Sequence, residues 1–195
     1  MTVLGYNTRM VGPTYTGRAV DLDRFREDDV DIEDIAHSLS MQCRYNGHTK
    51  QFYSVAEHSI HISNHLALCA YGPTVQLAGL LHDAHEAYVG DIIRPIVQDK
   101  MMLSFRRIRD AVQAVIESKF VIMLKPAERD AVDMLDKRII LDEKARLLHK
   151  AVIYDLGVRP LEVRFPLWNP AEAKVEFLAR FAMLVKSPAE VAHAS

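Results

Sequence analysis

The sequence predicts an all-α fold of about six helices that follows an irregular N-terminal segment. Apolar residues recur at the spacing of helices, helix-start signals precede the periodic runs, and strand signals are weak and short. A chain of 195 residues is long enough to bury one core without disulfides or a second module. We therefore expect a single domain over residues 1–195, with its core at about 32–148 and a C-terminal helix at about 170–185.

The first three helices are expected in the N-terminal half. Asp31 opens the segment DIEDIAHSLSMQC with acidic residues, which favour the positive end of a helix dipole. Ser54 and Glu57 have the Ser-x-x-Glu spacing of a capping box, which predicts a second helix that runs to about Ala70. A third helix follows Pro73, carries an apolar stripe through LAGLLHDA, and is expected to end at Gly90.

The remaining three helices are expected at Met102–Lys119, Pro126–Lys150 and Pro170–Val185. Two of them begin with a proline, which the first turn of a helix tolerates because its backbone N–H has no helical partner there. The segments YNGHTK and RFPLWNP are expected to be loops, since they are rich in turn residues.

Composition narrows the functional classes. The formal net charge is -2 and the pI is about 6.5, which argues against a nucleic-acid polymer or a membrane as partner but leaves room for a small phosphorylated ligand. The chain has two cysteines, Cys43 and Cys69, too few for a disulfide framework, and we expect both to act as small apolar residues. Without a long apolar stretch in the sequence, a cytoplasmic protein is expected.

Four separated side chains make a candidate metal site, namely His58, His82, Asp83 and Asp136. Two imidazoles and two carboxylates suit a borderline divalent ion and can leave coordination positions open for water and a substrate oxygen. Open positions are what metal-assisted hydrolysis requires. The set therefore predicts a metal centre with hydrolytic chemistry.

Helical spacing places two of these residues on inward faces. His58 lies three residues after Val55 and four before Ile62, so it projects from an apolar stripe, and Asp136 lies three residues before Ile139. A carboxylate aimed at a core costs several kcal/mol unless it is paired or bound to a metal.

Glu86 is expected to be a carboxylate beside the metal rather than a ligand, because it follows Asp83 by three residues and His82 by four. The alternative is that Glu86 orients a histidine ligand from outside the coordination shell. Asp91, which follows Gly90, is either part of the site or a cap of the turn.

These residues carry a resemblance to a known family. With their flanking segments YSVAEHS, LLHDAHEAYVGDI and the stretch from Asp136 to Glu143, they resemble the HD-domain metal-dependent phosphohydrolases, in particular the compact branch of bacterial 5'-deoxynucleotidases and phage dATP triphosphohydrolases. The resemblance covers about Ile32 to Leu148. It implies an all-α HD fold, one divalent transition metal ion per subunit (cobalt, manganese, zinc or nickel), hydrolysis of a deoxynucleotide phosphate, and a homo-oligomer.

The resemblance also implies residue roles. His58, His82, Asp83 and Asp136 match the metal ligands of that branch, and Glu86 and Asp91 match its catalytic carboxylates. Arg44 lies where relatives place a phosphate-contacting arginine, and Tyr45 stands in place of their tryptophan. His48 and Lys50 are further basic groups for a phosphate.

Three functions remain open at this point. The first is release of phosphate from deoxynucleoside 5'-monophosphates. The second is release of tripolyphosphate from a deoxynucleoside triphosphate of the dATP type. The third is an HD module that binds nucleotide or metal without catalysis. The first two share the metal and Glu86, so the products of the reaction separate them.

Overall fold

The all-α class is confirmed by a computed structural model of the protein, which describes residues 10–149 and 156–185. Within these ranges the helices of nine or more residues are α1 (Ile32–Met41), α2 (Val55–Leu68), α3 (Pro73–Leu81), α6 (Leu103–Lys119), α7 (Pro126–Leu147) and α8 (Pro170–Val185). Shorter helices are α4 (Glu86–Val89), α5 (Arg94–Val97) and the 3-10 turns η1 (Leu22–Arg24), η2 (Glu27–Asp29), η3 (Arg44–Gly47) and η4 (Lys100–Met102). Two short antiparallel strands, β1 (Val11–Pro13) and β2 (Ala19–Asp21), form a hairpin near the N-terminus.

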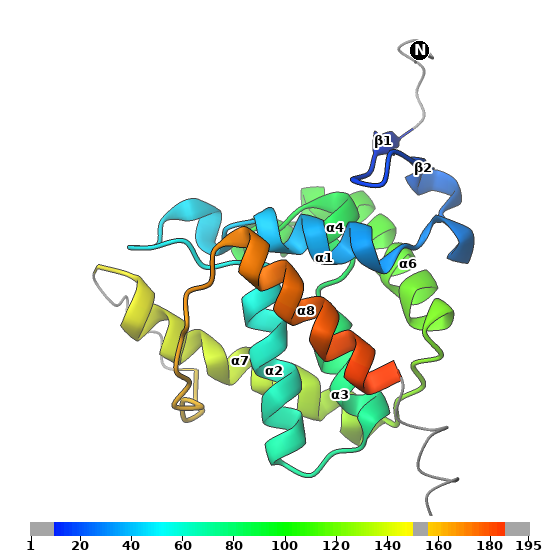
Figure 1. The fold of residues 1–195 in the computed structure, drawn as a ribbon. Coiled ribbons are helices and arrows are strands. Elements are labelled where there is room, and N and C mark those ends of the chain that lie inside the picture. The colour runs from blue at the N-terminus through cyan, green and yellow to red at the C-terminus, as the bar shows by residue number, and fades with distance from the viewer. Residues whose placement is uncertain (1–9, 150–155, 186–195) are drawn as a thin grey trace, which may run out of the picture.

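The antiparallel pair α2 and α3 lies at the centre of the bundle. Helix α8 crosses this pair and also packs on α1, while α7 packs on α2 and α3 (Figure 1). Buried apolar side chains from these helices and from α6 join in one cluster, so the described helices share a single core. In the described ranges no helix is both long and apolar enough to cross a bilayer.

Most predicted helix starts are confirmed. The Asp31 carboxylate accepts a hydrogen bond of 2.9 Å from the backbone N–H of Glu33, and Pro126 and Pro170 occupy the first turns of α7 and α8. Helix α7 ends at Leu147, whereas the predicted end at Lys150 lies outside the described residues. Both cysteines are free, so neither forms a disulfide, but Cys69 is exposed and the prediction that it packs as a small apolar residue is wrong.

The predicted capping box at the start of α2 is only half right. Ser54 Oγ accepts from the backbone N–H of Glu57 at 3.0 Å, as expected. The Glu57 carboxylate, however, is fully buried and accepts the backbone N–H groups of Leu167 and Trp168 at 3.0 and 2.9 Å. Glu57 therefore fixes the loop that precedes α8, because a buried carboxylate needs donors and this loop supplies two.

The prediction of one continuous helix from Pro73 to Gly90 is wrong. Helix α3 ends at Leu81, and a turn separates it from α4. Within the turn the backbone switches to bonds between residues three apart, such as Ala84 N–H to the Leu81 carbonyl at 3.0 Å.

The side chain of Gln113 in α6 bridges this break. Its amide nitrogen donates to the Leu81 carbonyl at 3.0 Å, and its amide oxygen accepts from the backbone N–H of His85 at 3.2 Å. Backbone groups that a continuous helix would pair internally thus find a side-chain partner from a distant helix. The break sets the direction of His82 and Asp83, which lie in the turn.

Gly79 marks the closest approach of α3 to α2. A Cβ atom added there would overlap Leu66 Cδ1 and lie 3.2 Å from Ile62 Cγ2. A side chain at this position would therefore push the two central helices apart.

We expect Gly79→Val to lower the free energy of unfolding by about 1–3 kcal/mol, because a branched side chain overpacks the interface between α2 and α3. Urea denaturation measures the change. Gly12→Val is the matched control, since a Cβ at Gly12 meets open space and valine suits the strand β1. Equal stability of the two variants would show that α2 and α3 can separate at no cost.

Candidate metal centre

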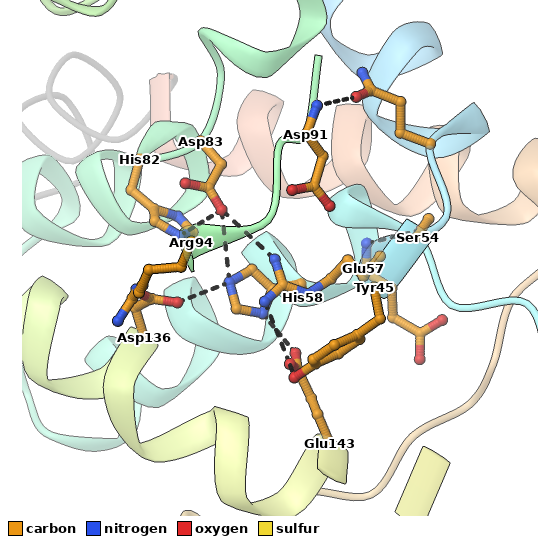
Figure 2. Close-up of polar contacts among 12 residues, drawn as sticks. Tyr45, Ser54, Glu57, His58, His82, Asp83, Asp91, Arg94, Asp136 and Glu143 are labelled. Atoms are coloured by element: carbon orange, nitrogen blue, oxygen red, sulfur yellow. Dashed lines mark hydrogen bonds and ion pairs between the residues drawn. The ribbon is translucent and has the colours of Figure 1, made fainter. Parts of the chain in front are cut away.

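Three separate elements bring the four predicted ligands together, and we call this group the metal cluster: His58 of α2, His82 and Asp83 of the turn after α3, and Asp136 of α7 (Figure 2). His58 is fully buried, and the other three side chains are between 13% and 20% exposed. The cluster therefore has one side in the core and one side open to solvent.

The ring nitrogens of the two histidines face carboxylate oxygens. His58 Nε2 lies 3.3 Å from Asp136 Oδ1 and 3.7 Å from Asp83 Oδ2, and His82 Nε2 lies 3.0 Å from the same Asp83 oxygen. Both Nε2 atoms are buried, and none of these three contacts has the geometry of a hydrogen bond. These nitrogens and oxygens point at a common space instead of at each other.

The opposite nitrogen of each ring is engaged. His82 Nδ1 lies 2.9 Å from the carbonyl of Gly79, which can only accept, so this nitrogen carries the proton in neutral His82. His58 Nδ1 lies 2.6 Å from Glu143 Oε1. When both rings are neutral and both Nδ1 atoms donate, each Nε2 presents a lone pair toward Asp83, and a cation between them satisfies all these atoms. The donor set of His58, His82 and Asp83 could thus hold a metal ion, with Asp136 beside it.

The close approach of imidazoles and carboxylates in the metal cluster also shifts the pKa values of its residues. Burial lowers the pKa of His82, but Asp83 outweighs burial and raises it to about 9. Burial raises the pKa of Asp83, but the neighbouring His82 has the larger effect and holds that pKa well below its usual range. Burial also raises the pKa of Asp136, and there His58 has the larger effect, so the pKa of Asp136 is lowered too. Without a metal, the cluster therefore retains a proton on His82 up to mildly basic pH.

We expect metal affinity to rise as pH increases toward about 9, since the ion must displace the His82 proton. Loss of one proton corresponds to roughly a tenfold gain in affinity per pH unit below that pKa. Isothermal titration of cobalt or manganese into protein at pH 6, 7 and 8, in buffers of different ionisation enthalpy, measures affinity and proton release together. Affinity that is constant across this range would contradict the assignment of His82 as a ligand.

Glu143 of α7 belongs to the candidate site but is not among the site residues predicted from the sequence. Its fully buried carboxylate accepts from Tyr45 Oη at 2.6 Å, from Tyr53 Oη at 3.0 Å and from Arg44 Nη2 at 3.3 Å. Burial raises the pKa of Glu143, but Arg44 and His58 outweigh it and lower that pKa to about 2. Glu143 is therefore an ionised carboxylate that orients a candidate ligand, His58.

A sequence signal for Glu143 existed. It follows Asp136 by seven residues and Ile139 by four, so all three share the inward face of one helix. A charged residue on such a face needs partners, and this holds for Glu143 as it does for Asp136. The partners themselves, on the loop before α2, are not visible in that spacing.

The loop that carries Arg44 and Tyr45 has a strained backbone. Tyr45, Asn46 and Gly47 adopt φ values of 57°, 51° and 74°, which places three consecutive residues in the left-handed region. For the two non-glycine residues this costs about 1–3 kcal/mol each. The bonds of Arg44 and Tyr45 to the Glu143 carboxylate offset that cost, so the loop is fixed against α7.

The two predicted catalytic carboxylates lie beside the cluster. Glu86 Oε2 is buried without a hydrogen-bond partner, and burial together with Asp83 raises the pKa of Glu86 well above its usual value. Burial also raises the pKa of Asp91, whose backbone N–H donates to Gln42 Oε1 at 2.9 Å. Oxygen and nitrogen atoms of Asp83, His85 and Glu86 also lie close enough to share an ion. A carboxyl group with a raised pKa next to a metal cluster is suited to proton transfer.

The predicted substrate-binding residues separate into two pairs. Arg44 is 12% exposed and contacts Glu143 and Asp83, the latter at 3.8 Å, and the Tyr45 hydroxyl is bound to Glu143. His48 and Lys50 are exposed further along the loop, where their backbone N–H groups donate to the carbonyls of Tyr45 and Leu147. The structure thus brings Arg44 and Tyr45 to the metal cluster and leaves the side chains of the other pair at the surface.

Comparison with known proteins gives two relatives. No family model matches the chain. It is 37% identical over 109 residues to the uncharacterized protein YfdR of Escherichia coli, a match that covers 55% of this chain and 56% of YfdR. The chain thus spans little more than half the length of YfdR. It is also 32% identical over 187 residues to the uncharacterized protein RCAP_rcc00048 of Rhodobacter capsulatus, which covers 88% of this chain and 94% of that protein. The chain therefore belongs to the family of the Rhodobacter capsulatus protein RCAP_rcc00048.

Proposed function

We propose that the chain is a metal-dependent phosphohydrolase of the HD type that releases orthophosphate from deoxynucleoside 5'-monophosphates. The observation that carries the proposal is the pair of buried Nε2 atoms on His58 and His82, which face carboxylate oxygens without making a hydrogen bond. The raised pKa of Glu86, beside these atoms, supports a hydrolytic role over simple metal storage.

The metal cluster would hold one divalent transition ion, with cobalt, manganese, zinc and nickel all compatible with nitrogen and oxygen donors. Such an ion supplies a Lewis acid that polarises a phosphoryl oxygen and lowers the pKa of water toward neutrality. Glu143 and the Gly79 carbonyl fix the tautomers of His58 and His82, so both rings offer Nε2 to the ion.

Residues of the chain carry the remaining steps of hydrolysis. The water oxygen forms a bond to phosphorus while the bond from phosphorus to the 5'-oxygen of the sugar breaks. The leaving oxygen gains a proton and the attacking water loses one. Glu86 takes part in this exchange, because burial and the neighbouring Asp83 raise the pKa of its carboxyl group well above the usual value, and such a group can donate as well as accept a proton. Arg44 offsets the negative charge that develops on the phosphoryl oxygens.

An assay of products tests the proposal. All deoxynucleoside mono- and triphosphates are incubated with the protein and each of several divalent ions, and orthophosphate, pyrophosphate and tripolyphosphate are quantified. Orthophosphate and free deoxynucleoside from the monophosphates are expected. Intact tripolyphosphate from a triphosphate would replace the proposal with a triphosphohydrolase. An absence of turnover with every substrate and ion would contradict a phosphohydrolase and leave a binding module.

A further inference from the structure

Arg94 contacts the metal cluster from its solvent side. It begins the short helix α5, and its Nη2 donates to Asp136 Oδ2 at 2.9 Å (Figure 2). The other oxygen of the same carboxylate, Oδ1, is the one that faces His58 Nε2. The Arg94 side chain is 58% exposed, whereas that of Asp136 is 20% exposed. Arg94 thus joins the metal cluster to solvent.

The carboxylates around the metal cluster repel a phosphate, so binding of a phosphate there calls for a cation such as Arg94. Three carboxylates lie in or next to the metal cluster, and each contacts a cation or an imidazole: Asp83 contacts Arg44, Asp136 contacts Arg94 and Glu143 contacts His58. Arg44 is nearly buried and is already committed to Glu143 and Asp83. Arg44 and one bound divalent ion would together balance these three carboxylates, so a phosphate gains net electrostatic attraction only from a further cation. Arg94 supplies positive charge on the side from which a solute arrives.

A second cation lies close to Arg94. Burial lowers the pKa of Lys144 in α7, and repulsion from Arg94 lowers it further. Two cations that repel each other at the edge of an acidic cluster are both stabilised when an anion binds near them. The positive charge at this edge of the metal cluster is therefore complementary to a phosphate group.

The position of Arg94 is fixed from the other end of its helix. Arg106 of α6 donates to the carbonyl oxygens of Val97 and Asp99, at the C-terminal end of α5 and just after it. Asp136 uses one nitrogen of the guanidinium, and a guanidinium has five N–H donors in a planar fork. The exposed part of that fork is available to a ligand without loss of the bond to Asp136.

We propose that Arg94 binds the phosphate group of the substrate from the solvent side of the metal cluster, and so adds to the positive charge that Arg44 supplies. The inference rests on the proposed function for the identity of the substrate. Binding of phosphate itself does not depend on turnover, so it can be tested separately. Charge-assisted hydrogen bonds from arginine to phosphate are bidentate and stronger than those from lysine. Arg94→Lys is therefore expected to bind phosphate with an affinity between those of the unsubstituted protein and Arg94→Ala.

The test uses Arg94→Ala, Arg94→Lys and a control, Arg24→Ala, which removes an exposed arginine from η1. Calorimetry first measures manganese binding to each protein and then inorganic phosphate binding at saturating manganese. We expect Arg94→Ala to weaken phosphate binding about 10- to 100-fold, Arg94→Lys to weaken it less, and the control to leave it unchanged. Manganese affinity should stay the same or increase, since Arg94 competes with the ion for the Asp136 charge.

The opposite pattern would overturn the inference. If Arg94 merely orients Asp136, Arg94→Ala loses manganese affinity and binds phosphate as the unsubstituted protein does once manganese is saturating. Phosphate binding that is unaffected by Arg94→Ala therefore rejects the role of Arg94, whatever the hydrolysis assay gives. A protein that binds phosphate through Arg94 but hydrolyses no nucleotide rejects the proposed function and retains the anion site.

Discussion

Glu86→Gln is expected to lower turnover by about 10²- to 10⁴-fold, the usual contribution of a general acid or base, while the metal content stays the same. The amide has the shape of the carboxyl group but cannot exchange the proton that passes between water and the leaving oxygen. Among the described residues no hydrogen bond joins the Glu86 carboxyl group to His58 or His82, and its Oε2 has no hydrogen-bond partner. Its removal should therefore leave the metal cluster intact.

Three measurements separate a loss of proton transfer in Glu86→Gln from a loss of metal or of folding. Steady-state kinetics give turnover, elemental analysis gives metal content, and thermal denaturation without metal gives stability. The pKa of Glu86 is raised in the folded protein, so above the pKa of the unfolded chain its ionisation opposes folding. The neutral variant should thus be at least as stable at pH 7. Glu176→Gln, an exposed site on α8, is the control. An active, metal-loaded Glu86→Gln protein would show that another group transfers the proton.

Glu143→Ala is expected to lower the free energy of unfolding by about 3–5 kcal/mol, because it removes the carboxylate to which buried Arg44 is hydrogen-bonded. It should also weaken metal affinity about 10- to 100-fold, since Glu143 fixes the orientation of the His58 ring. Urea denaturation of the metal-free protein and calorimetric metal titration measure the two effects independently. A loss below about 1 kcal/mol would indicate that the loop before α2 relaxes without this carboxylate.

Glu143→Gln is the matched variant, with the same volume and no charge. The folded-state pKa of Glu143, about 2, lies below the unfolded value of 4.5, so the stability it contributes is present above pH 4.5 and is lost as pH falls through about 2. The stability difference between Glu143→Gln and the unsubstituted protein should therefore shrink as pH is lowered from 5 toward 2. A difference that is independent of pH would mean that volume, and not charge, is what the network needs.

The features that the sequence predicts correctly depend on residues that are close together along the chain. Apolar periodicity and caps located the six longer helices, and helical spacing predicted that His58 and Asp136 both face inward, where the structure brings them together. These signals work because helix geometry couples residues three and four apart. The assignment of the metal cluster to an HD phosphohydrolase stays a prediction that the product assay tests.

What the sequence determined by itself, then, is the set of helices and which of their faces turn inward. Only the tertiary structure decided the break between α3 and α4, which Gln113 bridges from 28 and 32 residues away, and the buried carboxylate network in which Glu143 meets His58 across 85 residues. The physical reason is that a backbone or carboxylate group takes whichever partner burial leaves within reach. Helical spacing shows that Glu143 needs a partner, and only the packing of α7 against α2 and its preceding loop determines which partners it finds.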